Sequence, residues 1–164
     1  MRPPGGARML RRGRDQRTVG MSIKTNPGNF FEDFELGQEI VHAVPRTVTA
    51  GDVALYIGLT GARFALHASD SFARAVGYGK APVDDILTFH IVFGRTVADI
   101  SLNAIANLGY AQCKFGAPVY AGDTIYPALE VTELVPGRTT GAVTLRSTVF
   151  NQRRELVLEG MQKF

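Results

Sequence analysis

The chain has 164 residues and 45% of them are hydrophobic, which is enough for one domain with a substantial core. The sequence contains no apolar run long enough to cross a bilayer, no cluster of Cys and His with zinc-ligand spacing and no phosphate-binding glycine loop. We therefore expect no membrane segment and no metal site. The single cysteine, Cys113, excludes an intramolecular disulfide and favours a reducing compartment, the cytoplasm.

The net charge of +3 originates at the N-terminus. Residues 1–20 hold six arginines and one aspartate, so the rest of the chain carries a balance of −2. This segment lacks apolar periodicity and is predicted to be a disordered basic tail, continued by a polar leader to residue 29. Three interpretations stay open: an arm for anionic surfaces, a transit peptide, or sequence upstream of a natural start at Met21. Because no basic patch follows, we expect no nucleic-acid partner.

The first elements are predicted from alternation and capping signals. Ordered structure is expected to begin near Phe30, and the alternating residues 39–44 predict a strand that ends before Pro45. Thr49 is the predicted N-cap of a helix that carries Tyr56 on one side.

A loop and a short helix are predicted next. Residues 61–68 have no helical or strand pattern and are predicted to be a loop. Ser69 is the predicted N-cap of a short helix that stops at Gly77. This part of the chain leads into a much longer apolar segment.

The stretch APVDDILTFHIVFG is the most informative because it combines carboxylates and a histidine with an apolar helical pattern. A long helix is predicted from 83 to 99, with Pro82 at a first-turn position and Asp84 and Asp85 where the helix dipole favours negative charge. His90 is predicted to share a face with the apolar residues, which are Val83, Ile86, Leu87, Phe93 and Val97. The helix is either a well-capped core element or the floor of an active site.

The second half of the chain is predicted to be all strand. Its four strand-like segments, separated by Gly, Pro and polar turns, are residues 106–115, 123–134, 141–150 and 155–164. Short connections make the strands antiparallel, and a long apolar helix needs a sheet to bury it. The predicted fold class is therefore α+β, a hot-dog fold in which a curved antiparallel sheet wraps around a long central helix. A single sheet leaves edges exposed, so a dimer or higher oligomer is expected.

The chain resembles the MaoC-like hydratases, hot-dog enzymes that add water across enoyl-CoA double bonds. Residues 56–67 have the outline of their signature, an aromatic residue followed by S/T-G-D-x-N-P-L-H, and residues 118–124 match their P-V-x-x-G-D-T motif. Residues 81–94 and 101–111 resemble one branch, the mesaconyl-CoA hydratases, also called β-methylmalyl-CoA dehydratases. The resemblance covers residues 30–164 as one domain and matches the N-terminal half of those enzymes.

The resemblance implies catalytic residues, with two departures. His67 keeps the signature histidine, but Ala62 stands where the family has its aspartate, and Asp84 and Asp85 replace a His-Gly pair at the start of the central helix. The implied catalytic set is His67, Asp84 and Asp85, with an aspartate as base and His67 as acid or water-orienting partner. Backbone N–H groups at the helix start would stabilise the thioester oxygen. Helix capping alone is the alternative for both aspartates.

Four further residues are predicted to bind substrate. Arg63 would hold a substrate carboxylate, and Tyr56, His90 and Asn107 would contact the substrate. Each has a structural alternative: solvation for Arg63, packing for Tyr56 and His90, and turn capping for Asn107. No separate cofactor is expected, because CoA is part of the substrate.

Two functions from different classes follow. The first is a lyase that reversibly hydrates a short, branched dicarboxylic enoyl-CoA resembling mesaconyl-CoA. The second is a weakened hot-dog subunit that binds acyl-CoA and works with a second hot-dog domain; a thioesterase is less favoured. The aspartates at positions 84 and 85 discriminate between the first two, because carboxylates beside His67 favour the enzyme and carboxylates that only cap the helix favour the binding subunit.

Overall fold

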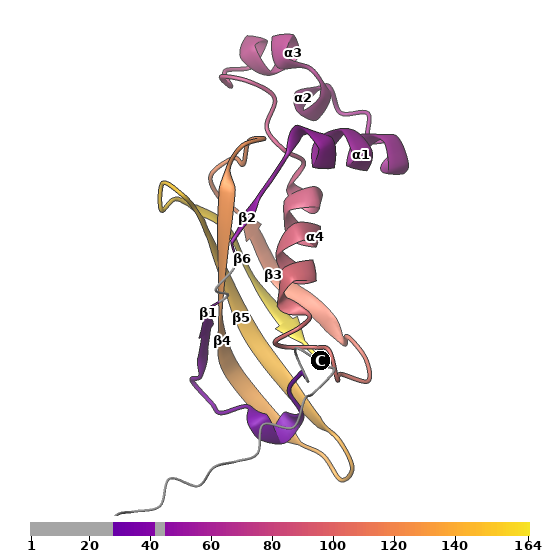
Figure 1. The fold of residues 1–164 in the computed structure, drawn as a ribbon, viewed down its shortest axis with the longest axis vertical. Helices are drawn as coiled ribbons and strands as arrows, with labels where there is room; N and C mark the ends of the chain where they lie inside the picture. The colour runs from indigo at the N-terminus through magenta and orange to yellow at the C-terminus, as the bar shows by residue number, and fades with distance from the viewer. Residues whose placement is uncertain (1–27, 42–44) are drawn as a thin grey trace, which may run out of the picture.

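The computed structural model describes residues 28–41 and 45–164 (Figure 1). Residues 1–27 of the tail and leader predicted for 1–29, and residues 42–44 of the strand predicted for 39–44, lie outside them. Three long strands form the centre of one antiparallel sheet, which has the order β1-β4-β5-β6-β3. They are β4 (Thr124–Pro136), β5 (Gly141–Asn151) and β6 (Leu156–Lys163). The edge strand β3 (Gly109–Phe115) follows β6, while the short β1 (Glu39–Val41) and β2 (Arg46–Thr47) both pair with β4.

The strand alternation that predicted the sheet also builds its core. Along β4 the buried Ile125, Leu129 and Val131 alternate with more exposed residues, as a half-buried strand requires. On β5 the residues with inward-facing side chains pair with them, so that Leu145 lies opposite Val131. The four long predicted strands are confirmed within a few residues at each end.

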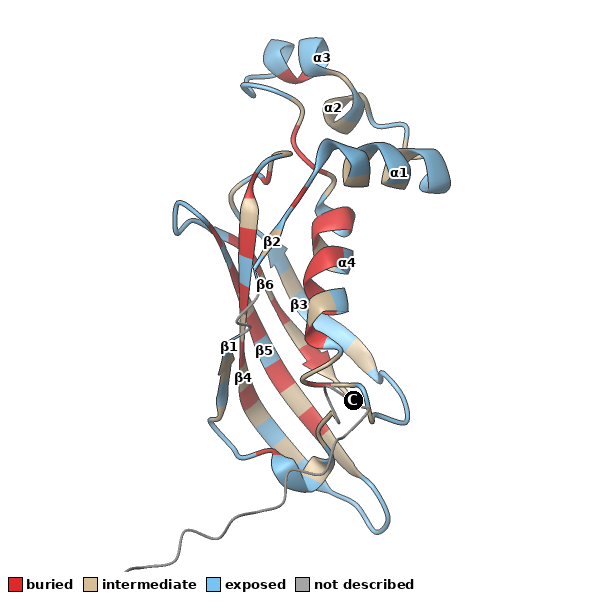
Figure 2. Ribbon diagram, viewed as in Figure 1, coloured by how far each residue is buried: buried red, intermediate tan, exposed pale blue. Residues whose placement is uncertain are grey.

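The central helix α4 (Asp85–Thr96) lies along one face of the sheet, as Figure 1 shows. Its buried residues pack with Ile125 on β4, Val149 on β5 and Leu158 on β6; they include Leu87, Ile91, Val92 and Phe93. Figure 2 shows this buried side of α4 in red. None of the helices in the described part of the chain is long and apolar enough to cross a membrane.

Two predictions about α4 are wrong. The helix begins at Asp85 rather than at 83, because the Asp84 side chain accepts the backbone N–H of Ile86 and caps it, so Pro82 precedes the helix. His90 does not share the buried face but lies exposed beside Ile86 (47% exposed) and Val97 (41%). The helix is apolar on both sides, so its apolar period alone could not tell the buried side from the open one.

Three shorter helices gather beyond the end of the sheet where α4 starts (Figure 1). Helix α1 (Ala50–Thr60) has the predicted Thr49 cap, which forms a capping box with Asp52. Helix α3 (Asp70–Ala75) has the predicted Ser69 cap. Between them, residues 61–68 are not all loop, because α2 (Ala65–Ala68) makes one helical turn. A 3₁₀ turn, η1 (Phe31–Asp33), lies near the opposite end of the sheet.

The P-V-x-x-G-D-T motif has a structural role at the start of β4. Its Asp123 is nearly buried, with a side chain 8% exposed, and pairs with Arg153 through Nη1 at 2.9 Å and Nη2 at 3.3 Å. Gln152 Nε2 and the Tyr120 N–H donate to the same carboxylate. Burial by itself raises the pKa of Asp123, but these hydrogen bonds outweigh it and lower the pKa below 3.8. The motif thus ties β4 to the β5–β6 hairpin.

Candidate active site

The ring of His67 is oriented by one hydrogen bond. His67 lies in α2, and its Nδ1 is 3.0 Å from the carbonyl oxygen of Pro82. Because a carbonyl oxygen can only accept, Nδ1 carries the hydrogen, and Nε2 of the neutral ring therefore presents a lone pair. The bond brings α2 to the segment that leads into α4, although these residues are 15 positions apart.

The two aspartates at the start of α4 differ in their surroundings. Asp84 caps the helix, with Oδ1 accepting the Ile86 N–H at 2.8 Å. Asp85 makes no cap and is exposed at the surface, yet partial burial among its neighbours raises its pKa above 3.8. His67 lowers the pKa of Asp85 and Asp84 raises it, which brings all three predicted catalytic residues into electrostatic contact.

The start of α4 also carries unused backbone donors. Within the described residues, the N–H of Ile86 is capped by Asp84 and that of Thr88 bonds to the Asp84 carbonyl. The N–H groups of Asp85 and Leu87 have no acceptor among those residues. Free donors at a helix start favour a developing negative charge, because the helix dipole adds to their hydrogen bonds.

A narrow apolar hollow of about 320 Å³ adjoins His67. Helix α1 contributes one wall and the segment before α4 the other; the lining includes Val53, Ile57, Pro82 and Val83. Five of its lining residues are alanines, which leave space where larger side chains would fill it: Ala50, Ala54, Ala68, Ala81 and Ala121. The imidazole therefore lines a mostly apolar hollow that also includes Asp70, and small-molecule sites usually combine apolar walls with a few polar groups.

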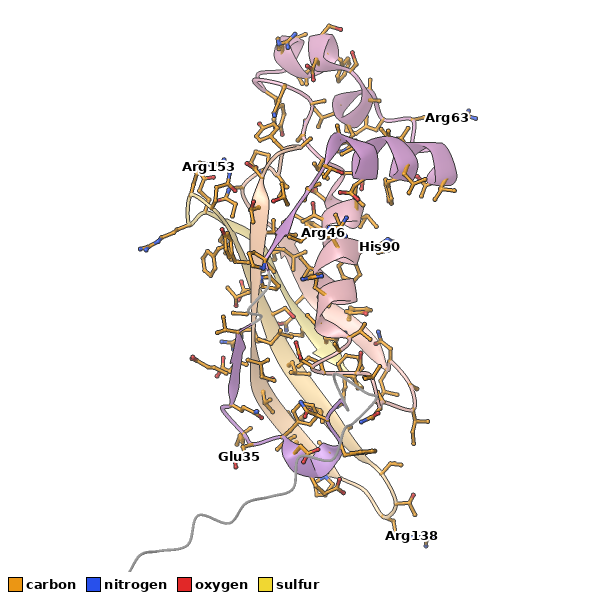
Figure 3. The ribbon with its side chains drawn as sticks, viewed as in Figure 1. Glu35, Arg46, Arg63, His90, Arg138 and Arg153 are labelled. Carbon is orange, nitrogen blue, oxygen red and sulfur yellow. The ribbon has the colours of Figure 1, made fainter. Side chains whose placement is uncertain are left out.

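The predicted substrate-binding residues divide into two places. The Tyr56 and His90 rings meet edge to face at 6.3 Å, and burial, followed by the charge of Asp84, raises the pKa of Tyr56. Figure 3 shows the Arg63 side chain pointing outward beyond the end of α1, away from the start of α4. Asn107 lies after the helix, where its Nδ2 donates to the Tyr110 hydroxyl at 2.6 Å.

A second hollow of about 500 Å³ lies along the open side of α4 and contains His90 and Asn107. Its polar lining also includes Ser101 and two residues that the sequence analysis missed, Tyr110 and Gln162. They stand opposite each other on β3 and β6. No local pattern identifies Gln162, because only the strand register brings it to this place. Within the described residues, no group of three His, Cys, Asp or Glu side chains is placed to hold a metal ion.

One long helix lying against a curved antiparallel sheet defines the hot-dog class. The chain belongs to the MaoC-like domain family, whose model matches residues 32–152. Over 141 residues it is 60% identical to the β-methylmalyl-CoA dehydratase of Chloroflexus aurantiacus, which covers 85% of this chain and 40% of that one. It is 52% identical to the mesaconyl-CoA hydratase of Cereibacter sphaeroides, over 83% of this chain and 40% of the relative.

Solved structures agree with this assignment. A crystal structure from Chloroflexus aurantiacus, described as a MaoC domain protein dehydratase, superposes with a TM-score of 0.83 at 58% identity, covering 87% of this chain and 41% of that one. A Mycobacterium tuberculosis protein described as having a double hot-dog fold superposes with a TM-score of 0.75 at 25% identity, over 83% and 43%. The predicted α+β hot-dog fold and the predicted family are confirmed. The chain spans about 40% of the length of the curated relatives it matches.

Proposed function

We propose that this domain carries the hydration chemistry of a lyase that interconverts a short dicarboxylic enoyl-CoA and its 3-hydroxyacyl-CoA. The observation that carries the proposal is the His67–Pro82 hydrogen bond, which leaves Nε2 free to accept a proton on a ring that interacts electrostatically with Asp85 at the start of α4. The names of the two similar relatives, one a hydratase of mesaconyl-CoA and one a dehydratase of β-methylmalyl-CoA, support the substrate class.

The expected roles of aspartate and histidine are exchanged in this proposal. His67 Nε2 takes a proton from water as the water oxygen bonds to the β-carbon, and the π electrons move onto the thioester as an enolate. Asp85 supplies the proton that bonds to the α-carbon; burial raises its pKa, which is the direction that an acid in this step requires. A proton then passes from His67 to Asp85 to reset the pair. Dehydration runs the same steps backwards.

The enolate oxygen needs donors during this step. The N–H groups of Asp85 and Leu87, unbonded within the described residues, meet that need at the start of α4. Asp84 keeps its capping role and is not assigned a proton transfer. Arg63, predicted to hold a substrate carboxylate, points outward in the isolated domain, so that role stays a prediction.

A second hot-dog unit is the partner that the open side of α4 fits. Ile86 and Val97 on the helix are more than 40% exposed, and Ile105 beyond it is 85% exposed. Exposed apolar side chains on one element favour a protein interface. The strand β3, which ends the sheet among the described residues, lies beside α4 (Figure 1). The unit is either a second copy of this chain or a separate hot-dog domain, in keeping with relatives more than twice as long.

An acyl-CoA-binding subunit is the alternative, and it is favoured by Ala62, which stands where the family signature has its aspartate. Loss of absorbance of the conjugated thioester in mesaconyl-CoA, with crotonyl-CoA as comparison, discriminates the two. Turnover that is lost in His67→Ala and in Asp85→Asn supports the lyase. Glu35→Gln is the control, because it removes a carboxylate at the far end of the sheet (Figure 3). Tight binding of the saturated thioester without turnover supports the binding subunit.

A further inference from the structure

The second hollow, on the open side of α4, has a polar floor that the proposed chemistry does not use. Most of its lining is apolar, contributed by Phe89 and Phe93 on α4 and by Val97, Ile105 and Phe164 beyond it. Two polar side chains of the lining, Asn107 and Gln162, meet at the hydroxyl of a third, Tyr110. A mostly apolar recess with a few convergent polar groups is the usual form of a small-molecule site.

Three side chains form the polar cluster. Asn107 Nδ2 donates to the Tyr110 oxygen at 2.6 Å, and Gln162 Nε2 lies 3.4 Å from the same oxygen. Asn107 is itself oriented, because its Oδ1 accepts the Gly109 N–H at 3.0 Å. The Tyr110 ring packs edge to face against the rings of Phe89 and Phe93, with centroids 4.8 and 4.7 Å away, and those two rings contact each other. The hydroxyl therefore has a defined position.

The cluster is incomplete as a hydrogen-bond network. Gln162 is only 2% exposed, and its Oε1 has no partner among the described residues, which is costly for a buried polar atom. The Tyr110 oxygen already receives two N–H groups, so its own hydrogen remains to be donated, and those two donors strengthen it. Rotation of the Gln162 amide would direct Oε1 at that hydrogen. The Tyr110 hydroxyl can therefore donate a hydrogen bond to a ligand. When no ligand is bound, it can donate to Gln162 Oε1 after the amide rotates.

The ligand group that fits this site is a hydrogen-bond acceptor. An anionic acceptor would form the strongest hydrogen bond with the Tyr110 hydroxyl. His90 lines the same hollow, and within the described residues its ring contacts only the rings of Tyr56 and Phe89. His90 follows Asp85 by five residues, about 7 Å along a helix. An acyl chain whose far end enters this hollow would therefore lie beside His90 and Tyr110.

We propose that Tyr110, positioned by Asn107 and Gln162, binds the distal carboxylate of the acyl group and so selects dicarboxylic over monocarboxylic thioesters. This inference rests on the proposed function for the substrate class. It gives the carboxylate a receptor that differs from the Arg63 expected from the sequence. Tyr110 donates one hydrogen bond to a carboxylate oxygen, and the apolar walls enclose the carbon chain.

The test measures binding, not turnover. Succinyl-CoA and butyryl-CoA have four-carbon acyl groups, differ in the distal carboxylate and cannot be hydrated, and their Kd values are determined by titration calorimetry on the full chain. We expect Tyr110→Phe to weaken succinyl-CoA binding about tenfold to a hundredfold, as loss of one hydrogen bond to a charged group does, and to change butyryl-CoA binding less than twofold. Tyr126→Phe, the same change at an exposed site on β4, is the matched control.

A second variant guards against a folding defect in the first. Asn107→Asp, at an exposed turn residue, places a negatively charged carboxylate next to the Tyr110 hydroxyl. This variant should also weaken the binding of succinyl-CoA more than that of butyryl-CoA. Equal losses for both thioesters, or no loss for either, would overturn the inference. If the chain hydrates no substrate but the variants still lose succinyl-CoA binding selectively, this inference is supported and the proposed lyase activity is contradicted.

Discussion

The imidazole of His67 and the carbonyl of Pro82 are joined at 3.0 Å, and this bond places a base next to a helix start. The segment that contains Pro82 is itself held in place by a second hydrogen bond. The next residue, Val83, donates its N–H to the carbonyl of Val119, which precedes β4, at 2.7 Å. Two hydrogen bonds therefore position the histidine of one short helix relative to the first turn of another. Catalytic groups require this kind of support from neighbouring structure.

Replacing His67 should separate its chemical role from its structural role. His67→Asn puts an amide N–H close to where Nδ1–H stands, so it can keep the bond to Pro82 while it removes the base. We expect kcat to fall about 10²- to 10⁴-fold with little change in stability. His67→Ala should lose the same activity and, in addition, about 1 kcal/mol of unfolding free energy. Hydration assays and urea melts on both variants check this; retained turnover in His67→Asn would contradict the assignment.

Replacing Asp85 should abolish activity and slightly increase the stability of the fold. Because its pKa is raised in the folded chain, the folded chain binds this proton more tightly than the unfolded chain does. Ionisation of Asp85 therefore destabilises the fold as the pH rises from 3.8 to the raised pKa. Asp85→Asn removes this effect, and we expect a gain within about 0.5 kcal/mol at pH 7, because the side chain is exposed. Turnover should be lost. Thermal melts at pH 4 and pH 7 test the sign, and a variant less stable at pH 7 would refute it.

Asp123 should behave in the opposite sense. Its lowered pKa stabilises the fold at any pH above its ordinary value of 3.8, and that contribution is lost as pH falls through the lowered value. Asp123→Asn breaks the pair with Arg153, for which we expect a loss of about 1–3 kcal/mol at pH 7 and a flatter acid denaturation curve. Glu130→Gln breaks an exposed pair with Arg146 and should cost less than about 1 kcal/mol. Equal costs would contradict the buried role of Asp123.

The absence of a side chain at Gly160 leaves room for the Cys113 side chain. A Cβ at position 160 would stand 2.9 Å from the Cys113 sulfur, so Gly160→Ala should cost about 1–3 kcal/mol. Cys113→Ala in the same chain should recover most of the loss, and a double-mutant cycle measures this coupling. Gly58→Ala is the matched control, because nothing lies within 4 Å of its Cβ and a helix interior favours alanine. Additive losses at positions 113 and 160 would argue against direct contact.

The open side of α4 should control assembly. Ile86→Glu introduces a charge in the first turn of α4, at the side proposed for the second hot-dog unit. We expect the variant to sediment as a smaller species than the parent chain in analytical ultracentrifugation, with its circular dichroism preserved. Val135→Glu, at a comparably exposed site near the far end of β4, should leave the assembly unchanged. An unchanged sedimentation coefficient for Ile86→Glu would place the partner elsewhere.

Local signals in the sequence were sufficient for most of the fold. Thr49 and Ser69 were predicted as caps because capping depends on a few neighbouring residues, and the strands because alternation is local. The exposed side of α4 was misassigned because the apolar residues of its open side resemble those of its buried side. A sequence pattern shows that a face is apolar, not which surface covers it.

The site was predictable only where a motif marks it. His67 was found because it keeps a family position, and the aspartates because of their place at a helix start. Tyr110 and Gln162 were missed because the register between β3 and β6 brings them together across 52 residues. The tautomer of His67 depends on a carbonyl in another segment, which no spacing rule identifies.

The sheet order has a consequence for how the chain folds. The β4–β5 and β5–β6 hairpins join neighbours in the sequence, whereas β1 must reach β4 from the other side of the whole helical region. Closing that long loop costs entropy that the hairpins do not incur, and contacts between distant residues slow folding. We therefore expect the three C-terminal strands to acquire amide-exchange protection first during refolding, and the β1 edge to acquire it last.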